Sequence, residues 1–236
     1  MKQQLPTAVI LAGGLGTRLR PLVSDRPKAL AVVAGRPFIL YQLEWLCRNF
    51  VQSVIICVGY KGEQIVDCLG DGSHLGMKIA YSRESTPLGT AGALAEAAHL
   101  LPAEFLVLNG DTYTAMELEP LWEAHHRRGA LATLAAAPAV HVKDSAAVGS
   151  IKIGPDGRIL SFREKQPGAK LVSMGIYAVS RELVPLIPQQ RPCSLERDVF
   201  PNLPGLYGYL SPASFIDIGT PTGYRAANRQ LSKLPT

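Results

Sequence analysis

The chain has 236 residues, of which 47% are hydrophobic and 18% are charged. A chain of this length and composition can bury an apolar core, which excludes a disordered chain and a coiled coil. The formal net charge is +5, and no run of five or more Lys or Arg supports nucleic-acid binding. We expect a single domain over residues 1–236 and no nucleic-acid partner. Whether the protein forms a homo-oligomer is left open.

The apolar segments are too short to cross a membrane, because the longest, residues 130–140, contains a proline and has only eleven residues. The N-terminal residues lack the pattern of a signal peptide. Four cysteines show no metal-ligand spacing, and two of them, Cys47 and Cys57, lie within apolar patterns. We therefore predict reduced core cysteines, a cytoplasmic location and no membrane partner.

The first half of the chain alternates short apolar runs with amphipathic segments. Strands are predicted at residues 8–12, 54–58, 78–81, 105–108 and 132–137. Helices are predicted at residues 37–47, 63–69, 91–101 and 116–128. This alternation implies right-handed crossovers and a parallel sheet covered on both faces.

The second half has a different pattern. Residues 148–153 and 158–163 flank a Pro-Asp-Gly turn and predict a β-hairpin, and residues 171–179 predict a further strand. Helices are predicted at residues 181–186, 195–202 and 221–231. The predicted fold class is α/β: a doubly wound, mostly parallel, Rossmann-like sheet with a small inserted antiparallel β region near residues 140–175. Ligands bind such sheets beyond the carboxyl ends of the strands.

A glycine-rich loop with two cations follows the first predicted strand. The sequence runs Gly13-Gly14-Leu15-Gly16-Thr17-Arg18, and Lys28 follows ten residues later. Glycines let backbone N–H groups approach phosphate oxygens, while an arginine can grip phosphate with its planar fork. The loop matches neither the Walker pattern nor the dinucleotide-binding pattern. By itself it leaves open an ordinary structural turn with surface charges nearby.

Two aspartates occupy positions that suit a divalent cation. Asp111 follows the predicted strand at residues 105–108, and Asp217 lies between apolar residues just before a predicted helix. A carboxylate at a strand end suits a hard cation, although each residue alone could equally cap a turn or a helix. Two such acids with a cationic glycine loop match the charge pattern of Mg²⁺ and a triphosphate.

The combined motifs resemble the sugar-1-phosphate nucleotidyltransferase family. The matching segments occur in family order over nearly the whole chain: GGLGTRLRPL at 13–22, PKAL at 27–30, PLGTAGAL at 87–94, NGD at 109–111, FREK at 162–165, GIY at 175–177, SLERDVFP at 194–201 and DIGTP at 217–221. The sequence departs from the usual Glu-Lys-Pro triplet at 164–167, and Ser173 stands where many relatives have Asn.

The resemblance implies an enzyme that joins a nucleoside triphosphate to a sugar-1-phosphate and releases pyrophosphate. It implies catalytic roles for Arg18, Lys28, Asp111 and Asp217, with Mg²⁺ held by the two aspartates. The implied nucleotide-binding residues are Leu11, Ala12, Gly13, Gly14, Gly16, Thr17, Arg18, Glu84, Leu88, Gly89 and Thr90. The implied sugar-phosphate-binding residues are Asn109, Gly149, Glu164, Lys165, Ser173 and Gly175, and the insertion near 140–175 is expected to bind the sugar.

The base and the sugar are harder to assign. Guanine presents two adjacent N–H donors that a carboxylate such as Glu84 can accept, which favours GTP, although Glu84 could also be an exposed loop acid. Only 19 residues follow Asp217, so we expect no appended β-helix domain. The chain looks most like D-glycero-D-manno-heptose-1-phosphate guanylyltransferases. N-acetylmuramate-1-phosphate uridylyltransferase, mannose-1-phosphate guanylyltransferase and a non-catalytic nucleotide-sugar-binding regulatory subunit remain alternatives.

Overall fold

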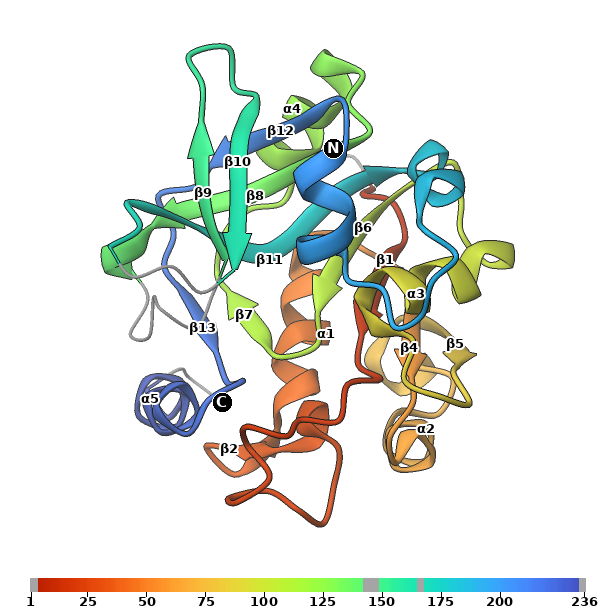
Figure 1. Ribbon diagram of the computed structural model, residues 1–236. Helices are drawn as coiled ribbons and strands as arrows, with labels where there is room; N and C mark the ends of the chain where they lie inside the picture. Colours follow the sequence, from red (N-terminus) through yellow and green to blue (C-terminus); the bar gives the residue numbers. More distant parts are fainter. Residues whose placement is uncertain (1–3, 142–148, 165–167, 234–236) are drawn as a thin grey trace.

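The computed structural model describes residues 4–141, 149–164 and 168–233. One half of its nine-stranded sheet is parallel (Figure 1). The central strand β1 pairs in parallel with β4 on one side and β6 on the other, and β4 pairs in parallel with β5. Their carboxyl ends therefore meet at one edge of the sheet. The bounds are β1 Ala8–Leu11, β4 Ser53–Val58, β5 Lys78–Arg83 and β6 Glu104–Asn109.

The other half of the sheet is built around the long strand β11, which runs antiparallel to β6, β8 and β9. The hairpin partner β10 extends the sheet beyond β9, and β12 pairs in parallel with β8. The predicted α/β sheet with an antiparallel region is confirmed, but the antiparallel pairing already includes β8, before residue 140, and continues along β11 to Ser180. The bounds are β8 Ala132–Pro138, β9 Gly149–Ile153, β10 Ile159–Glu164, β11 Leu171–Ser180 and β12 Leu206–Leu210.

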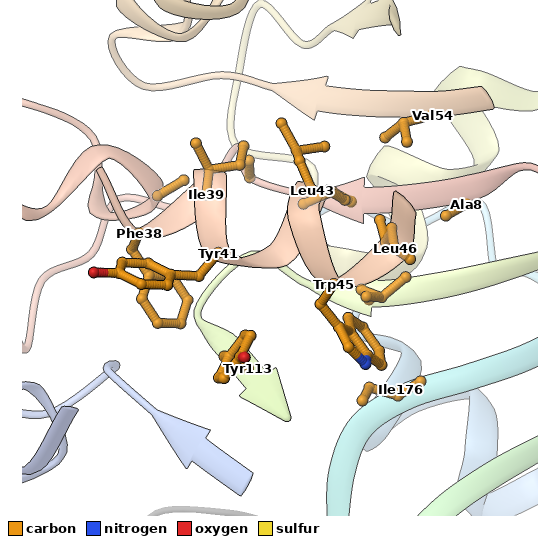
Figure 2. Close-up of a cluster of buried hydrophobic side chains, with 14 of the residues drawn as sticks. Ala8, Phe38, Ile39, Tyr41, Leu43, Trp45, Leu46, Val54, Tyr113 and Ile176 are labelled. Atoms are coloured by element: carbon orange, nitrogen blue, oxygen red, sulfur yellow. The ribbon is translucent and has the colours of Figure 1, made fainter. Parts of the chain in front are cut away.

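Helices cover both faces of the sheet. In β1, Ala8 and Ile10 belong to one buried hydrophobic cluster and Val9 to the other, as expected for a strand covered on both sides. Figure 2 shows Leu43 and Leu46 of α1 packing beside the sheet in the first cluster. The bounds are α1 Phe38–Arg48, α2 Gly62–Leu69, α3 Gly89–Glu96, α4 Glu119–Arg128 and α5 Pro221–Leu231. No helix among the described residues is long and apolar enough to cross a membrane.

Several predicted boundaries were wrong. The helix predicted at 91–101 becomes 3₁₀ after Glu96, and the one predicted at 116–128 begins at Glu119, with proline in its first turn. The segment predicted as a helix at 195–202 is a π-helical turn, Leu195–Val199, followed by the 3₁₀ turn Phe200–Asn202. Arg181–Leu186 is also 3₁₀.

The sequence analysis missed two strands that matter for the site. β7 (Thr112–Thr114) and β13 (Phe215–Asp217) pair with each other in a separate antiparallel ribbon. Three residues are too few to show a strand pattern, and the two segments are far apart in the sequence. A second small ribbon joins β2 (Val32–Val33) and β3 (Arg36–Pro37), which follow the 3₁₀ turn Lys28–Leu30.

The prediction of core cysteines is half right. All four cysteines are free, and Cys57 and Cys193 are buried, whereas Cys47 and Cys68 are exposed. In α1 the buried stripe runs through Ile39, Leu43 and Leu46, and Cys47 lies one residue past it. One helical position rotates a side chain by about 100°, which is enough to turn Cys47 toward solvent.

Candidate active site

A cleft of about 440 Å³ opens at the carboxyl ends of β1 and β6 and extends along β11. It brings together most of the residues singled out by sequence: Leu11, Ala12, Gly13, Gly14, Arg18, Lys28, Glu84, Gly89, Thr90, Asn109, Asp111, Gly149, Ser173, Gly175 and Asp217. Gly16, Thr17 and Leu88 are not among its lining residues. Glu164 ends β10 with its backbone paired to Gly149, but its side chain and all of Lys165 lie outside the described part of the chain.

The glycine-rich loop leaves β1 at the floor of this cleft. A Cβ atom on Gly13 would lie 2.2 Å from Glu84 Oε1, so a side chain there would displace the Glu84 carboxylate. Gly16 has a φ of +59°, in the left-handed region that glycine adopts without strain. The loop ends at Lys28, whose ammonium group forms an ion pair with the Asp111 carboxylate inside the cleft. The loop thus carries Arg18 and Lys28 to the same place as the strand-end acid.

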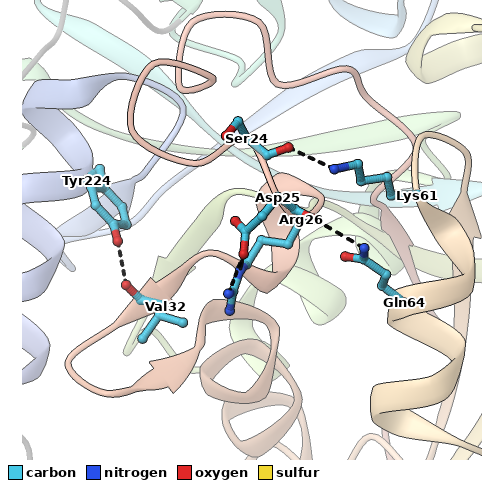
Figure 3. Close-up of polar contacts among 7 residues, drawn as sticks. All are labelled: Ser24, Asp25, Arg26, Val32, Lys61, Gln64 and Tyr224. Atoms are coloured by element: carbon cyan, nitrogen blue, oxygen red, sulfur yellow. Dashed lines mark hydrogen bonds and ion pairs between the residues drawn. The ribbon is translucent and has the colours of Figure 1, made fainter.

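The outer part of the loop is tied to helix α2 (Figure 3). Lys61 Nζ donates to the Ser24 carbonyl at 2.8 Å, and Gln64 Nε2 donates to the Asp25 carbonyl at 3.2 Å. The guanidinium of Arg20 stacks on the Tyr60 ring, 4.9 Å from its centroid. These contacts fix the path of the loop between the end of β1 and Lys28.

The two aspartates meet because β13 pairs with β7. This pairing sets Asp217 opposite Thr112, the neighbour of Asp111, and the Ile218 amide donates to the Asp111 carbonyl at 2.9 Å. A Cβ atom on Gly219 would lie 2.8 Å from Asp111 Oδ2 and 2.8 Å from Asp217 Oδ1. The same point is 3.3 Å from Arg18 Nη2. Two carboxylates from distant parts of the chain therefore converge beside a guanidinium.

The environment separates the pKa values of these two acids. Burial alone would raise the pKa of Asp111, but the Lys28 ammonium, with help from Arg18, holds it below its usual value. Burial and the nearby charge of Asp111 raise the pKa of Asp217 to about 7. The Asp217 Oδ1 atom accepts the Gly219 amide at 2.5 Å. The two carboxylates therefore repel each other when both are ionised, and Asp217 is the one that takes up a proton first as the pH falls.

A buried glutamine that sequence reasoning missed holds the Asp111 turn. The Gln42 side chain on α1 is fully buried, and its Nε2 atom donates to the carbonyls of Asn109 at 2.9 Å and Thr112 at 2.7 Å. These carbonyls flank Gly110 and Asp111. Gly110 packs so closely that a Cβ atom would lie 2.7 Å from the Leu11 carbonyl oxygen. Nothing in the apolar pattern of α1 distinguishes Gln42 from an ordinary polar position.

Glu84 follows strand β5 and lines the part of the cleft that is predicted to hold the nucleotide. Its Oε2 atom accepts the Leu88 amide at 3.3 Å, and its Oε1 atom faces Gly13 and Gly59. A Cβ atom on either glycine would lie within 2.4 Å of Oε1. Burial raises the pKa of Glu84 above its usual value. The carboxylate is therefore a partly buried cleft residue and not the exposed loop acid that the sequence left open.

The predicted sugar side gathers around β11. Gly175 has a φ of +66°, and a Cβ atom there would lie 2.9 Å from Asn109 Nδ2. The Ser173 hydroxyl accepts the Gly175 amide at 3.3 Å. Beside them lies Glu196, which the sequence analysis noted only as part of a motif; it lines the cleft and accepts hydrogen bonds from several segments.

The family model described as "Nucleotidyl transferase" matches residues 7–233. The chain belongs to the nucleotidyl transferase family. It is 36% identical over 232 residues to mannose-1-phosphate guanylyltransferase of Mycobacterium tuberculosis, covering 95% of this chain but 64% of that relative. It is 35% identical over 229 residues to D-glycero-alpha-D-manno-heptose 1-phosphate guanylyltransferase of Aneurinibacillus thermoaerophilus, covering 95% of this chain and 97% of the relative.

Solved structures of the family agree with the fold. The crystal structure of HddC from Yersinia pseudotuberculosis superposes with a TM-score of 0.83 at 33% identity, covering 95% of this chain and 99% of HddC. A second HddC structure, complexed with GMP-PN, gives a TM-score of 0.82 at 31% identity, covering 95% of this chain and 99% of that chain. The family resemblance and the α/β fold predicted from sequence are thereby confirmed.

Proposed function

We propose that this nucleotidyl transferase uses GTP and D-glycero-D-manno-heptose 1-phosphate, and releases pyrophosphate. The observation that carries the choice of GTP is the placement of Glu84, whose carboxylate lies partly buried at the cleft against Gly13 and Gly59. A carboxylate accepts the two adjacent N–H donors of guanine, while a uracil carbonyl in the same place would be repelled. HddC, a relative with the same fold, has been solved with GMP-PN.

The choice of heptose rests on two relatives that the chain matches over nearly their whole sequences. The chain covers 97% and 96% of two heptose-1-phosphate guanylyltransferases, from Aneurinibacillus thermoaerophilus and Campylobacter jejuni. It covers only 64% of the Mycobacterium tuberculosis mannose-1-phosphate enzyme, although the identity of 36% is comparable. Mannose 1-phosphate is therefore the second candidate for the sugar substrate.

In the proposed reaction a phosphate oxygen of the sugar-1-phosphate attacks the α-phosphorus of GTP. The bond to the β-phosphate oxygen breaks, and pyrophosphate leaves with the electron pair. We assign Arg18 and Lys28 to the phosphates, because both cations face the cleft from the glycine-rich loop. They would neutralise charge that builds up on the phosphate oxygens, while the cleft aligns the two substrates. No protein nucleophile is required.

We also propose that Asp111 and Asp217 hold a Mg²⁺ ion. The residues fit such an ion, because the buried carboxylate of Asp111 and the half-buried carboxylate of Asp217 converge, and the pKa of Asp217 is raised by burial and by its neighbour. Among the described residues, no group of three or more His, Cys, Asp or Glu side chains is arranged to hold a metal ion, so the two aspartates would bind it together with other ligands. Mg²⁺ is commonly held by one or two carboxylates together with substrate phosphates and water. When bound, the ion would offset phosphate charge that Arg18 and Lys28 leave unbalanced.

On the sugar side we propose contacts from Asn109, Ser173 and Gly175, which line one wall of the cleft. Gly149 belongs to the same wall, at the start of β9. Contacts from Glu164 and Lys165 rest on the family resemblance alone. We likewise retain the proposals of one domain over residues 1–236 and a sugar-binding role for residues 140–175.

The test is pyrophosphate release from GTP and UTP with heptose, mannose and N-acetylmuramate 1-phosphates. We expect the highest kcat/KM with GTP and the manno-configured heptose. Glu84→Gln should lower kcat/KM for GTP by about 10- to 100-fold, the scale of an unsatisfied buried polar group, and narrow the gap to UTP. Glu63→Gln is the matched control, because that side chain is 76% exposed.

A wild-type preference for UTP would contradict the guanylyltransferase proposal and favour the uridylyltransferase. Pyrophosphate release from none of these pairs would favour the regulatory alternative. If the wild type prefers GTP and Glu84→Gln leaves that preference unchanged, the base is recognised by other groups in the cleft.

A further inference from the structure

Glu196 lies at the junction of four chain segments. Its Oε2 atom accepts hydrogen bonds from the hydroxyls of Thr90 at 2.8 Å and Ser194 at 2.9 Å. Its Oε1 atom accepts from the hydroxyl of Tyr177 at 3.0 Å and from Asn109 Nδ2 at 3.4 Å. The residue belongs to the π-helical turn Leu195–Val199, a rare geometry that is frequent at functional sites.

These four donors fill the hydrogen-bond acceptor positions of the carboxylate. A carboxylate offers about four lone-pair positions, two on each oxygen. Each oxygen of Glu196 already has two protein donors, so none is left for a substrate hydroxyl in this arrangement. Although Glu196 lines the cleft, its contacts point to a role exerted through its neighbours.

The neighbours lie on both sides of the cleft. Thr90 lies in the first turn of α3, the segment that follows Glu84 on the nucleotide side, and its hydroxyl also accepts the Leu195 amide at 2.8 Å. Asn109 ends β6 two residues before Asp111, and Tyr177 lies on β11 two residues after Gly175. Tyr177 is fully buried, so its hydroxyl depends on a protein partner.

We propose that Glu196 is a positioning residue that fixes the nucleotide side of the cleft relative to its sugar side. The inference rests on the proposed function, because it needs the two substrates to bind on the two sides. One carboxylate holds Thr90 on the first side and Asn109 with Tyr177 on the second. Loss of the carboxylate should therefore loosen both binding sites together, whereas loss of one donor should loosen only one.

The test compares KM values for GTP and for the sugar-1-phosphate, each with the other substrate saturating. In Glu196→Ala both acceptor oxygens are removed, so Thr90 on the first side and Asn109 with Tyr177 on the second all lose their partner. We expect both KM values to rise about tenfold, the scale of a lost charge-assisted hydrogen bond. Thr90→Val should raise only the KM for GTP, and Tyr177→Phe only the KM for the sugar-1-phosphate.

Double variants show whether the effects pass through the same contacts. Adding Glu196→Ala to Thr90→Val should produce little further rise in the KM for GTP, because that contact is already lost. Asp198→Asn is the structural comparison, since Asp198 accepts the Ser194 amide at 2.7 Å in the same turn without lining the cleft. We expect it to lower the Tm without raising either KM. Glu182→Gln, at an exposed position, serves as the neutral control.

The possible outcomes distinguish a failure of the proposed function from a failure of the inference about Glu196. If the wild type makes no nucleotide sugar, the proposed function is wrong and this inference fails with it. If the wild type is active and Glu196→Ala leaves both KM values unchanged, or if Asp198→Asn raises both KM values at an equal loss of Tm, only the inference about Glu196 is wrong. A rise in one KM alone would also contradict it, because Glu196 would then serve one side of the cleft.

Discussion

Asp111 and Asp217 share one part of the cleft but differ in what balances their charge. Asp111 has an ion pair with Lys28, and Asp217 accepts the Gly219 amide. As a result, the pKa of Asp111 is lowered while the pKa of Asp217 is raised to about 7. A raised carboxylate pKa means that the folded protein retains a proton that the unfolded chain releases near pH 4. The contribution of Asp217 to stability is therefore present at low pH and lost as the pH rises toward 7.

The loss of stability with rising pH leads to a prediction for Asp217→Asn. Asparagine keeps an oxygen for the Gly219 amide but cannot ionise. In metal-free buffer we compare the Tm of the variant with that of the wild type at two pH values. We expect the difference, variant minus wild type, to be more positive at pH 8 than at pH 5. Thermal unfolding at both pH values, in the presence of a chelator, measures the difference. Asp156→Asn provides an exposed control, because its side chain is 61% exposed. A Tm difference that does not change with pH would contradict the raised pKa of Asp217.

At the scale of elements, the cleft depends on a loop held by a helix. The segment between β1 and Lys28 carries the glycines and Arg18, and its outer part is tied to α2 through Lys61 and Gln64. These side chains contact backbone carbonyls of the loop and do not line the cleft. Their expected effect is to reduce the entropy that the loop loses when it orders around a ligand.

Removing both contacts should weaken nucleotide binding selectively. For the double variant Lys61→Ala/Gln64→Ala we expect the KM for GTP to rise about three- to tenfold, as for one or two modest hydrogen bonds. The KM for the sugar-1-phosphate should stay unchanged, because that side of the cleft is formed by other elements. Steady-state kinetics with Lys78→Ala, an exposed residue of β5, as the control would test this. An equal rise in both KM values would mean that the loop contacts do not act on the nucleotide alone.

The elements that sequence predicted well are those with a local signal. The apolar runs of β1, β4 and β6 and the periodic stripe of α1 need only neighbouring residues to be recognised. By contrast, β7 and β13 have three residues each, and they form a ribbon only because the fold brings them together. The segment predicted as a helix at residues 195–202 forms a π-helical turn and a 3₁₀ turn instead, although Leu195, Val199 and Phe200 are buried at helical spacing.

At the scale of the whole molecule, the cleft residues found from sequence were those at strand ends and in family motifs. Gln42 was missed, and Glu196 was noted only as part of a motif, because the importance of both residues lies in their partners. Gln42 contacts carbonyls about 70 residues away in the chain, and the donors to Glu196 come from residues 90, 109, 177 and 194. Such assemblies have no local pattern, so the structure is needed to reveal them.

The C-terminal part of the chain also packs against the N-terminal part that contributes to the cleft. Tyr224 on α5 donates its hydroxyl to the Val32 carbonyl at 2.6 Å, and Asn228 Oδ1 accepts the Ala34 amide at 3.0 Å. Figure 1 shows α5 beside β2, with β13 leading into it. The cleft is therefore assembled from the N-terminal loop, the middle of the chain and its C-terminal part. A ligand that contacts all three should stabilise the whole fold and not one segment.

We expect GTP with Mg²⁺, at about one hundred times its Kd, to raise the Tm by about 5–10 °C, given a gain of about 2.7 kcal/mol for a protein of this size. Part of this gain should depend on Mg²⁺, because the metal would link Asp111 to Asp217. In Asp217→Asn the Mg²⁺-dependent part should be lost, while the part due to GTP alone remains. Thermal unfolding with GTP, in Mg²⁺ or in chelator, separates the two contributions. If Asp217→Asn keeps the full Mg²⁺-dependent shift, the two aspartates do not share the ion and the proposed metal site is wrong.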